Sequence, residues 1–481
     1  MAGVKMKNNI RRLSYLILGS FVVLSLYIGY VNVFLGPALA TDPHNRRLAA
    51  YEAKVHRGTI YDRRGAALAK SEGDRRSYPL GKDAAHVVGF ISQRYGRTGL
   101  ESAYDRYLLA MTDEEKIEVI IDRLLGRPRV GNDVVVTLDA RLQQLAMRLM
   151  GKRRGAVVAL DPRNGEILAL ASSPSYDPNA IGQPAGRSPD GKVLTVYDLL
   201  QRDKGAPLLN RATQGAYPPG STFKLITAAG ALTTNPEVIK RIFNCQGSLI
   251  IDGFRLADTA AHGAVDFYRA LAVSCNTTFA RLGLEMGAER FYQTARAFGL
   301  TLNPWAGGLP EVAYRPGTLA PPEKMNKPHL GSSAIGQGEV LVNPLQMALV
   351  AAAIANDGVI MRPHLLARVQ DPYGGVLLQS VPRPWLTAIS PEVAGVIKEA
   401  MVDVVREGTG RGAALSGITV AGKTGSAQNP KGDTHAWFVG FAPAEKPRVV
   451  VAVIVENGGA GGVVAAPIAR EMIRAVLTAG P

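Results

Sequence analysis

The stretch Tyr217-Pro218-Pro219-Gly220-Ser221-Thr222-Phe223-Lys224 joins a rigid loop to the start of a helix. Its two prolines fix φ and disfavour helix before Gly220, whereas the Ala-rich run after Lys224 favours helix. Residues at positions i and i+3 share a helix face, so we expect Lys224 beside the Ser221 hydroxyl, near the free N–H groups of the helix N-terminus. The stretch therefore predicts a nucleophilic serine with a lysine as its base.

Two further triplets strengthen this prediction. Ser274-Cys275-Asn276 has the pattern S-x-N, and Lys423-Thr424-Gly425 has the pattern K-T-G. A lone S-x-x-K is weak evidence, because both residue types are common at protein surfaces. The three patterns in this order, however, resemble the motif set of serine β-lactamases and penicillin-binding proteins.

Length and composition indicate an ordinary globular protein. The 481 residues are 47% hydrophobic and 20% charged, which suits two or three domains. There are 55 Lys and Arg against 40 Asp and Glu, a net charge of +15 that fits an anionic envelope or membrane surface. No basic block is interleaved with aromatic residues, so nucleic acid is not an expected partner.

The N-terminal region predicts a membrane anchor. Residues 13–35 contain no charge and are numerous enough to cross a bilayer as a helix. Four basic residues lie between Lys5 and Arg12 without an acidic one, which predicts a cytoplasmic tail at 1–12 and an extracytoplasmic remainder. Ala38-Leu39-Ala40 resembles a signal-peptidase site, but the apolar run is longer than a signal peptide needs, so an uncleaved anchor is preferred.

The chain changes character near residue 155. Residues 40–154 are charged and irregular, and we expect a non-catalytic pedestal domain that ends in a helix from Asp139 to Met150. Beyond it, strands at 156–160 and 166–171 flank an Asn-Gly pair, which predicts a hairpin.

The partner strands are expected at the far end of the chain. Apolar runs on either side of a Pro-containing turn predict strands at 435–441 and 448–455, and a closing helix is expected at 466–478. The Gly-rich run 457–462 is expected to be a flexible link. With the Ala-rich helical middle, these segments predict one α+β domain over 155–481, whose sheet is completed by distant segments.

From the anchor to the last helix, the chain resembles the class B penicillin-binding proteins, membrane-anchored D,D-transpeptidases of peptidoglycan synthesis. Besides the triplets, the resemblance rests on Arg57–Arg63, Thr137–Asp139, Gly155–Pro162, Gly336–Glu339 and Ala436–Pro443. It implies a penicillin-binding, serine β-lactamase-like transpeptidase domain with an antiparallel sheet and a helical subdomain. A dimerisation-like pedestal would precede that domain.

The resemblance implies roles for the first two motifs. Ser221 would form an acyl-enzyme with release of the terminal D-Ala, and Lys224 would take the serine proton. For this, the pKa of Lys224 must fall by about 3 units from its usual value, and both desolvation and the charge of Lys423 favour that direction. Ser274 would relay the leaving-group proton, and Asn276 would hold Lys224 and the substrate amide.

The third motif is assigned to substrate binding. Lys423 would recognise the terminal carboxylate of the substrate together with Thr424 and Ser426, and Gly425 would leave room for the acyl group. The backbone N–H groups of Ser221 and Ser426 would form the oxyanion hole.

No cofactor or metal is expected. Cys245 and Cys275 show no spacing typical of a zinc site or a disulfide framework; Cys275 is expected to be a packed free thiol, and a bridge between the two is left open. The seven histidines form no H-E-x-x-H pattern, and His262 is expected to be structural. The Gly-rich run 408–412 follows a predicted helix and lacks the context of a nucleotide-binding loop.

The implied ligands are peptidoglycan stem peptides, on a lipid-linked precursor or nascent glycan, and β-lactam antibiotics. A membrane glycosyltransferase is expected as a partner, because the chain has no room for such a domain. Alternatives are a D,D-carboxypeptidase, a β-lactamase and a catalytically idle scaffold of a cell-wall complex. The sequence does not distinguish division, elongation and sporulation, and it does not give the oligomeric state.

Overall fold

The computed structural model describes residues 2–35, 55–73, 75–111, 129–308, 310–429 and 432–478. The chain divides into one compact unit of Met1–His56 and Ile117–Val130 and another of Arg57–Lys116 and Gly131–Pro481.

The first unit contains the apolar N-terminal helix. Helix α1 spans Ala2–Tyr30 and continues as a π-helical turn over Val31–Leu35. Residues Asn8–Tyr30 have a mean hydropathy of 1.8 and no buried residue, so this helix has the length and composition of a membrane span, as expected. The short strands β1 (Val55–His56) and β7 (Arg129–Val130) pair in parallel. The possible cleavage site at 38–40 lies outside the described residues.

The second unit contains an antiparallel sheet built from both ends of its sequence. The strand order is β10-β9-β23-β22-β21, with β9 at Gly155–Leu160, β10 at Ile167–Ser173, β21 at Ala421–Asn429, β22 at Gly432–Ala442 and β23 at Val449–Val455. The predicted hairpin and the predicted distant partner strands are therefore confirmed. Strand β21, which contains the K-T-G triplet, lies at the sheet edge.

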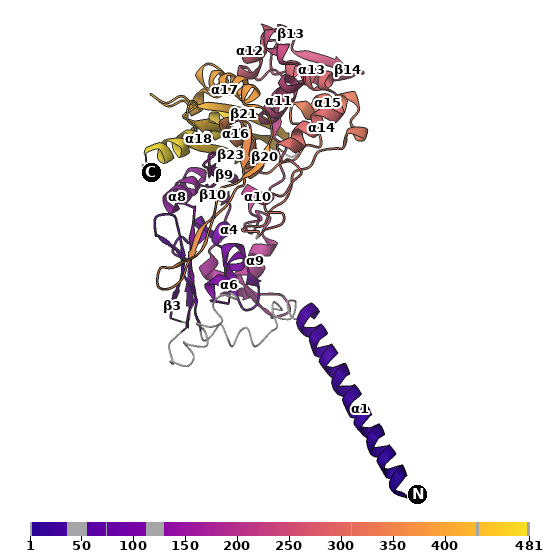
Figure 1. The fold of residues 1–481 in the computed structure, drawn as a ribbon. Helices are drawn as coiled ribbons and strands as arrows, with labels where there is room; N and C mark the ends of the chain where they lie inside the picture. The colour runs from indigo at the N-terminus through magenta and orange to yellow at the C-terminus, as the bar shows by residue number, and fades with distance from the viewer. Residues whose placement is uncertain are drawn as a thin grey trace. The chain divides into compact units, whose positions relative to one another are not determined.

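This sheet is the middle of three layers (Figure 1). Alternate residues of a strand point to opposite faces. In β23, Val451 and its odd-numbered neighbours pack with α8 (Ala140–Met150) and α18 (Gly461–Thr478), whereas Ala452 and its even-numbered neighbours share a core with α11 (Lys224–Thr234) and α16 (Pro344–Ala355). The expected flexible link at 457–462 is wrong at its end, because Gly461 and Gly462 already belong to α18.

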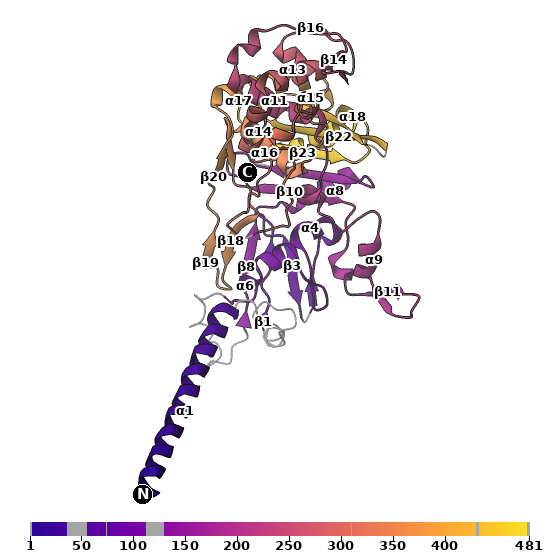
Figure 2. The ribbon, with the colours of Figure 1, turned by 90° about the vertical axis from the view of Figure 1, so that its right-hand side faces the viewer.

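A second sheet combines strands that are far apart in the sequence. Its order is β19-β18-β8-β2-β3-β4, with β2 at Ile60–Tyr61, β3 at Ala67–Glu72, β4 at Arg75–Ser77, β8 at Asp133–Val136, β18 at Leu366–Gln370 and β19 at Val376–Gln379. Strand β8 pairs with β2 on one side and with β18 on the other. Figure 2 shows β18 beside β8. The pedestal is predicted as the contiguous segment 40–154. This sheet is not contiguous, because β18 and β19 come from beyond residue 155.

Charged side chains are buried in the part of this unit that lies before residue 112. Arg57 Nε donates to Glu101 Oε2 at 2.8 Å, and Arg76 Nε donates to Glu101 Oε1 at 2.7 Å. Asp62 and Asp139 satisfy the N-terminus of α8, because they accept from the backbone N–H groups of Ala140 and Arg141. The Arg57–Arg63 segment thus packs through paired charges rather than through apolar contacts alone.

A helical subdomain, with two small hairpins, carries the S-x-N triplet. Its helices are α12 (Phe267–Ala272), α13 (Asn276–Met286), α14 (Ala288–Ala297) and α15 (Lys327–Ala334), and α17 (Pro391–Arg406) packs beside α11 and α12. Strand β13 (Phe243–Cys245) pairs with β16 (Gly263–Val265), and β14 (Ser248–Ile251) pairs with β15 (Phe254–Ala257). Asp266 caps α12 by accepting from Arg269 N.

The remaining described elements are short. Before residue 112 they are η2 (Gly81–Asp83), α4 (Ala85–Val88), β5 (Ile91–Ser92), β6 (Gly96–Arg97), α5 (Gly99–Ala103) and α6 (Asp105–Leu108). Later they are η4 (Pro178–Ala180), β11 (Pro184–Arg187), β12 (Val193–Thr195), α9 (Val196–Arg202), α10 (Arg211–Gln214), η6 (Pro236–Lys240), η7 (Pro322–Lys324), β17 (Val359–Met361), β20 (Pro384–Thr387) and η8 (Arg411–Ala413).

Candidate active site

Ser221 lies where a loop becomes a helix, as the sequence predicts. A 3₁₀ turn, η5, spans Gly220–Phe223, and α11 begins at Lys224. Gly220 has φ +53°, a left-handed conformation that glycine adopts without steric cost. Its backbone N–H donates to Gly336 O at 2.9 Å, so the geometry of the turn depends on a segment more than a hundred residues away.

The loop before Ser221 is fixed on several sides. Trp437 Nε1 donates to Pro218 O at 3.0 Å, and the backbone of Tyr217 pairs with Val342. The Tyr217 hydroxyl donates to Glu456 Oε1 at 2.8 Å, and the buried Arg211 donates to the same oxygen at 2.7 Å. The serine is therefore held in place by the sheet and its neighbours before any substrate binds.

Lys224 is fully buried and makes its contacts to the S-x-N triplet. Its Nζ donates to Ser274 O at 2.5 Å and to Asn276 Oδ1 at 2.7 Å, and lies 3.2 Å from Ser274 Oγ. Burial lowers the pKa of Lys224 to about 7, against the opposing effect of the Asp258 carboxylate and the nearby thiols. Near neutral pH, a large share of Lys224 is therefore the free amine.

The contacts of Lys224 suit a base. Ser274 O and Asn276 Oδ1 accept two N–H groups, which are all that a neutral lysine amine has. Its lone pair then remains available for a proton from a serine hydroxyl. Asn276 holds Lys224 in the way that the family resemblance implies.

Ser274 connects Lys224 to the second buried lysine of the site. Lys423 Nζ donates to Ser274 Oγ at 2.9 Å and to Thr424 O at 3.0 Å. Burial, and then the charge of Lys224, lower the pKa of Lys423. From the sequence, we expect the charge of Lys423 to lower the pKa of Lys224. In the structure, the charge of Lys224 lowers the pKa of Lys423 instead.

Lys423 does not reach the surface at which a substrate carboxylate would bind. Its side chain is fully buried, and it is absent from the residues that line the cleft. In this structure Lys423 contacts Ser274, and its part in recognition of a carboxylate stays a prediction.

A cleft of about 820 Å³ opens over these residues. It is lined by the other residues predicted for the site, namely Ser221, Ser274, Asn276, Thr424, Gly425 and Ser426. The two lysines lie beneath them, and each contacts Ser274. The fold thus brings the three sequence motifs together at one cleft.

The structure shows a close contact that a side chain at position 425 would disturb. A Cβ at this position would lie 2.9 Å from Pro219 O and 3.1 Å from Thr222 Cγ2. The missing side chain lets edge strand β21 approach the Ser221 loop, and the room predicted for the acyl group stays a prediction.

Sequence reasoning missed several residues that line the cleft. Arg255 and Arg411 are exposed at its wall, with Thr409 and Gln428, and no acidic side chain lines it among the described residues. Thr409 Oγ1 lies 2.6 Å from Thr424 Oγ1. The Gly-rich run 408–412 was the only signal in the sequence for this wall, and its spacing matches no catalytic motif. The cleft is therefore cationic and rich in hydroxyl groups.

Comparison with known proteins agrees with this geometry. The family described as penicillin binding protein transpeptidase domain matches residues 155–474, and the penicillin binding protein A dimerisation domain matches residues 57–134. Peptidoglycan D,D-transpeptidase PbpA of Mycolicibacterium smegmatis is 36% identical and aligns with 99% of this chain and 100% of its own length. Peptidoglycan D,D-transpeptidase MrdA of Acinetobacter baumannii is 33% identical over 80% of this chain and 64% of its own.

Solved structures show the same fold. Penicillin-binding protein A from M. tuberculosis, as its imipenem acyl-enzyme complex, has a TM-score of 0.79 and 36% identity, covering 89% of this chain and 100% of that one. Its penicillin G acyl-enzyme complex has a TM-score of 0.78 and 35% identity, covering 88% and 99%.

Proposed function

The chain belongs to the family of penicillin-binding protein transpeptidases, and we propose that it cross-links peptidoglycan stem peptides through an acyl-enzyme on Ser221. The observation that carries this proposal is the buried Lys224, whose pKa of about 7 and contacts to Ser274 and Asn276 fit a base for the adjacent serine. β-Lactams acylate the same serine, as the acyl-enzyme complexes of the M. tuberculosis relative support.

Acylation follows from the positions of these groups. Ser221 Oγ attacks the carbonyl carbon between the two D-Ala residues while its proton passes to Lys224 Nζ. The backbone N–H groups of Ser221 and Ser426 stabilise the oxyanion. When the C–N bond breaks, the departing D-Ala amine takes a proton from the Ser274 hydroxyl, which is restored from the ammonium of Lys224. The amine of a second stem then attacks the ester, its proton passes to Lys224, and the released Ser221 oxygen takes that proton.

The cleft wall supports an anionic substrate. Arg255 and Arg411 lie at the wall, and Thr424 and Ser426 offer hydroxyl groups on the edge strand. We assign recognition of the terminal D-Ala carboxylate to Thr424, Ser426 and Arg411, with Lys423 acting from below through Ser274. Arg411 is exposed at the cleft and can contact a carboxylate directly, whereas Lys423 is buried and its burial lowers its pKa.

The N-terminal helix anchors this activity to the membrane. We assign 1–12 to a cytoplasmic tail and 13–35 to the anchor, because the basic residues precede the apolar run. Residues 40–154 form most of a non-catalytic pedestal, and 155–481 carry the catalytic part in the extracytoplasmic space. A membrane glycosyltransferase would supply the glycan strands on which the stem peptides are presented.

The test is intact-protein mass spectrometry of the full chain in detergent after addition of benzylpenicillin. A stable penicilloyl adduct is expected on the unmodified protein and on Ser102→Ala, which removes an exposed serine of α5, but not on Ser221→Ala. An adduct on Ser221→Ala, or none on the folded unmodified protein, would refute the assignment of the nucleophile. An adduct lost within seconds would indicate a β-lactamase.

A second assay separates transpeptidation from carboxypeptidation. The full chain would be given a lipid-linked pentapeptide precursor together with a glycosyltransferase. Cross-linked dimers with release of D-Ala are the expected products. Release of D-Ala without dimers would identify a D,D-carboxypeptidase.

A further inference from the structure

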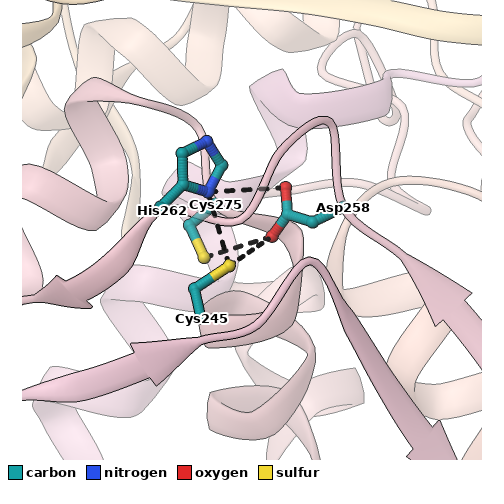
Figure 3. A group of neighbouring side chains, drawn as sticks. All are labelled: Cys245, Asp258, His262 and Cys275. Carbon is teal, nitrogen blue, oxygen red and sulfur yellow. Dashed lines mark hydrogen bonds and ion pairs between the residues drawn. The ribbon is translucent and has the colours of Figure 1, made fainter.

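Four side chains capable of binding a metal converge beside the S-x-N triplet. They are Cys245, Asp258, His262 and Cys275, and their ligand atoms all lie within 4.8 Å of one another (Figure 3). Both cysteines are buried, the Asp258 side chain has no exposed surface, and the His262 side chain is only 13% exposed. Both cysteines are free thiols.

The spacing of these atoms fits a tetrahedral zinc site. With Zn–S bonds near 2.3 Å and Zn–N or Zn–O bonds near 2.1 Å, a tetrahedron places sulfur roughly 3.5 Å from nitrogen or oxygen, and nitrogen roughly 3.4 Å from oxygen. Cys245 Sγ lies 3.4 Å from His262 Nδ1 and 3.4 Å from Asp258 Oδ2. Cys275 Sγ lies 3.2 Å from Asp258 Oδ2, and His262 Nδ1 lies 3.8 Å from Asp258 Oδ1.

The kinds of donor atom select among metals. Two thiolates, one imidazole and one carboxylate make a closed four-coordinate set, which suits Zn²⁺ and not the harder Mg²⁺ or Ca²⁺. We propose that Cys245, Asp258, His262 and Cys275 bind a structural Zn²⁺ ion. Binding releases the two thiol protons, because the ligands are thiolates. This proposal revises the expectation, drawn from sequence spacing, that the chain holds no metal.

Hydrogen bonding around the cluster would orient two of the ligands. Asp258 Oδ2 also accepts from Thr277 N at 2.9 Å, and Thr278 Oγ1 donates to Cys275 Sγ at 3.1 Å. Such outer contacts to metal ligands fix their direction and raise metal affinity. Without a metal, the two thiols take part only in weak hydrogen bonds, so the convergence of the four side chains has little stabilising effect on the thiols.

The site joins three separate segments of the subdomain. Cys245 ends β13, Asp258 and His262 lie in the loop between β15 and β16, and Cys275 immediately precedes α13. Cys275 is also the middle residue of the S-x-N triplet. A bound ion would thus fix the backbone that presents Ser274 and Asn276 to Lys224, so these four ligands act as positioning residues for the proposed reaction.

Metal content tests the site directly and does not depend on acylation. The full chain, expressed with zinc in the medium and purified in detergent without a histidine tag, should contain about one zinc per chain by plasma mass spectrometry. Cys245→Ser and His262→Ala should lower zinc affinity by more than the roughly 10–100-fold that loss of an outer-shell partner costs. The control Asp252→Asn changes an exposed acid of the β14–β15 turn and should keep the zinc.

A spectrum of the unmodified chain tests the ligands even if a variant fails to fold. After exchange of zinc for Co²⁺, thiolate-to-metal charge-transfer bands in the near ultraviolet and intense tetrahedral bands in the visible are expected. Removing the metal should slow benzylpenicillin acylation, and added Zn²⁺ should restore it. If the proposed function fails, zinc content and the cobalt spectrum still test the site.

Several outcomes would overturn the proposal. These are less than a tenth of an equivalent of zinc after incubation with the ion, full zinc retention in Cys245→Ser, or a cobalt spectrum without thiolate bands. A Cys245–Cys275 disulfide in the purified protein would overturn it as well, because a bridged pair cannot supply two thiolates.

Discussion

Lys423 Nζ donates to Ser274 Oγ at 2.9 Å, although the two residues are 149 positions apart. The same hydroxyl lies 3.2 Å from Nζ of Lys224, so one serine connects two fully buried lysines. Two buried ammonium groups this close are strongly disfavoured, and burial lowers the pKa of both. The pair therefore disfavours two ammonium groups, and acylation needs the neutral amine to be Lys224, whose pKa burial lowers to about 7.

The acylation rate should follow the protonation of Lys224. The protonated amine cannot accept the Ser221 proton, so the rate should rise with pH, with a midpoint near 7, and level off above it. Well below the midpoint, it should fall about tenfold per pH unit. Second-order rates of benzylpenicillin acylation, measured by mass spectrometry across pH, check this. A midpoint near 10.5, the ordinary pKa of lysine, would contradict the role of burial.

Replacing Ser274 should separate catalysis from stability. Ser274 has φ +62°, a conformation that costs a non-glycine residue about 1 kcal/mol or more. Ser274→Ala and Ser274→Gly both lose the hydroxyl, and both should slow acylation by about 10²–10⁴-fold. Ser274→Gly should nevertheless be about 1 kcal/mol more stable than Ser274→Ala in thermal or denaturant unfolding. Equal stability of the two variants would show that the backbone is not strained there.

Gly425→Ala should loosen the contact between β21 and the nucleophile loop. The added Cβ would lie 2.9 Å from Pro219 O, so the strand or the loop must move. A displacement of this size is expected to slow acylation about 10–100-fold, because the backbone N–H groups of Ser221 and Ser426 would no longer both point at the oxyanion. Gly395→Ala is the matched control, since its Cβ meets no atom within 4 Å on helix α17, and it should leave the rate unchanged.

Glu101→Gln should lower the free energy of unfolding, although Glu101 takes no part in the catalytic chemistry. Glu101 is fully buried between Arg57 and Arg76, and a neutral amide leaves buried guanidinium charge without its partner. A loss of about 3–5 kcal/mol in the free energy of unfolding is expected. Glu72→Gln removes an exposed partner of Lys70 and should cost at most about 1 kcal/mol. Similar unfolding free energies for both variants would contradict the expectation that the buried ion pairs of Glu101 contribute more to stability than the exposed pair of Glu72.

The catalytic motifs could be predicted because each is local. Pro218 and Pro219 specify the loop before Ser221 by their own geometry, and the Asn164-Gly165 pair specifies the hairpin of β9 and β10. Their mutual arrangement is not local, and it was the family resemblance that predicted a common site for Ser221, Lys224, Ser274 and Asn276.

The remaining features depend on contacts between distant segments. Cys245 and Cys275 are 30 positions apart, and only the pairing of β13 with β16 brings Cys245 to the loop that holds His262. The burial of Lys423 could not be predicted, because a lysine on an edge strand is expected to face solvent. The close approach of Gly425 to the loop before Ser221 was missed for a similar reason, since its near neighbour there is the backbone of another motif.

The pairing of β18 with β8 has a consequence for biogenesis. Strand β8 ends at Val136, yet its neighbour on one side begins only at Leu366, so more than two hundred residues must be synthesised before the sheet can close. During synthesis from the N-terminus onward, that edge of β8 stays open, and an open edge is prone to pair wrongly. The pedestal therefore matures after much of the catalytic part has emerged, and a chain cut short at residue 154 would lack the strand that completes it.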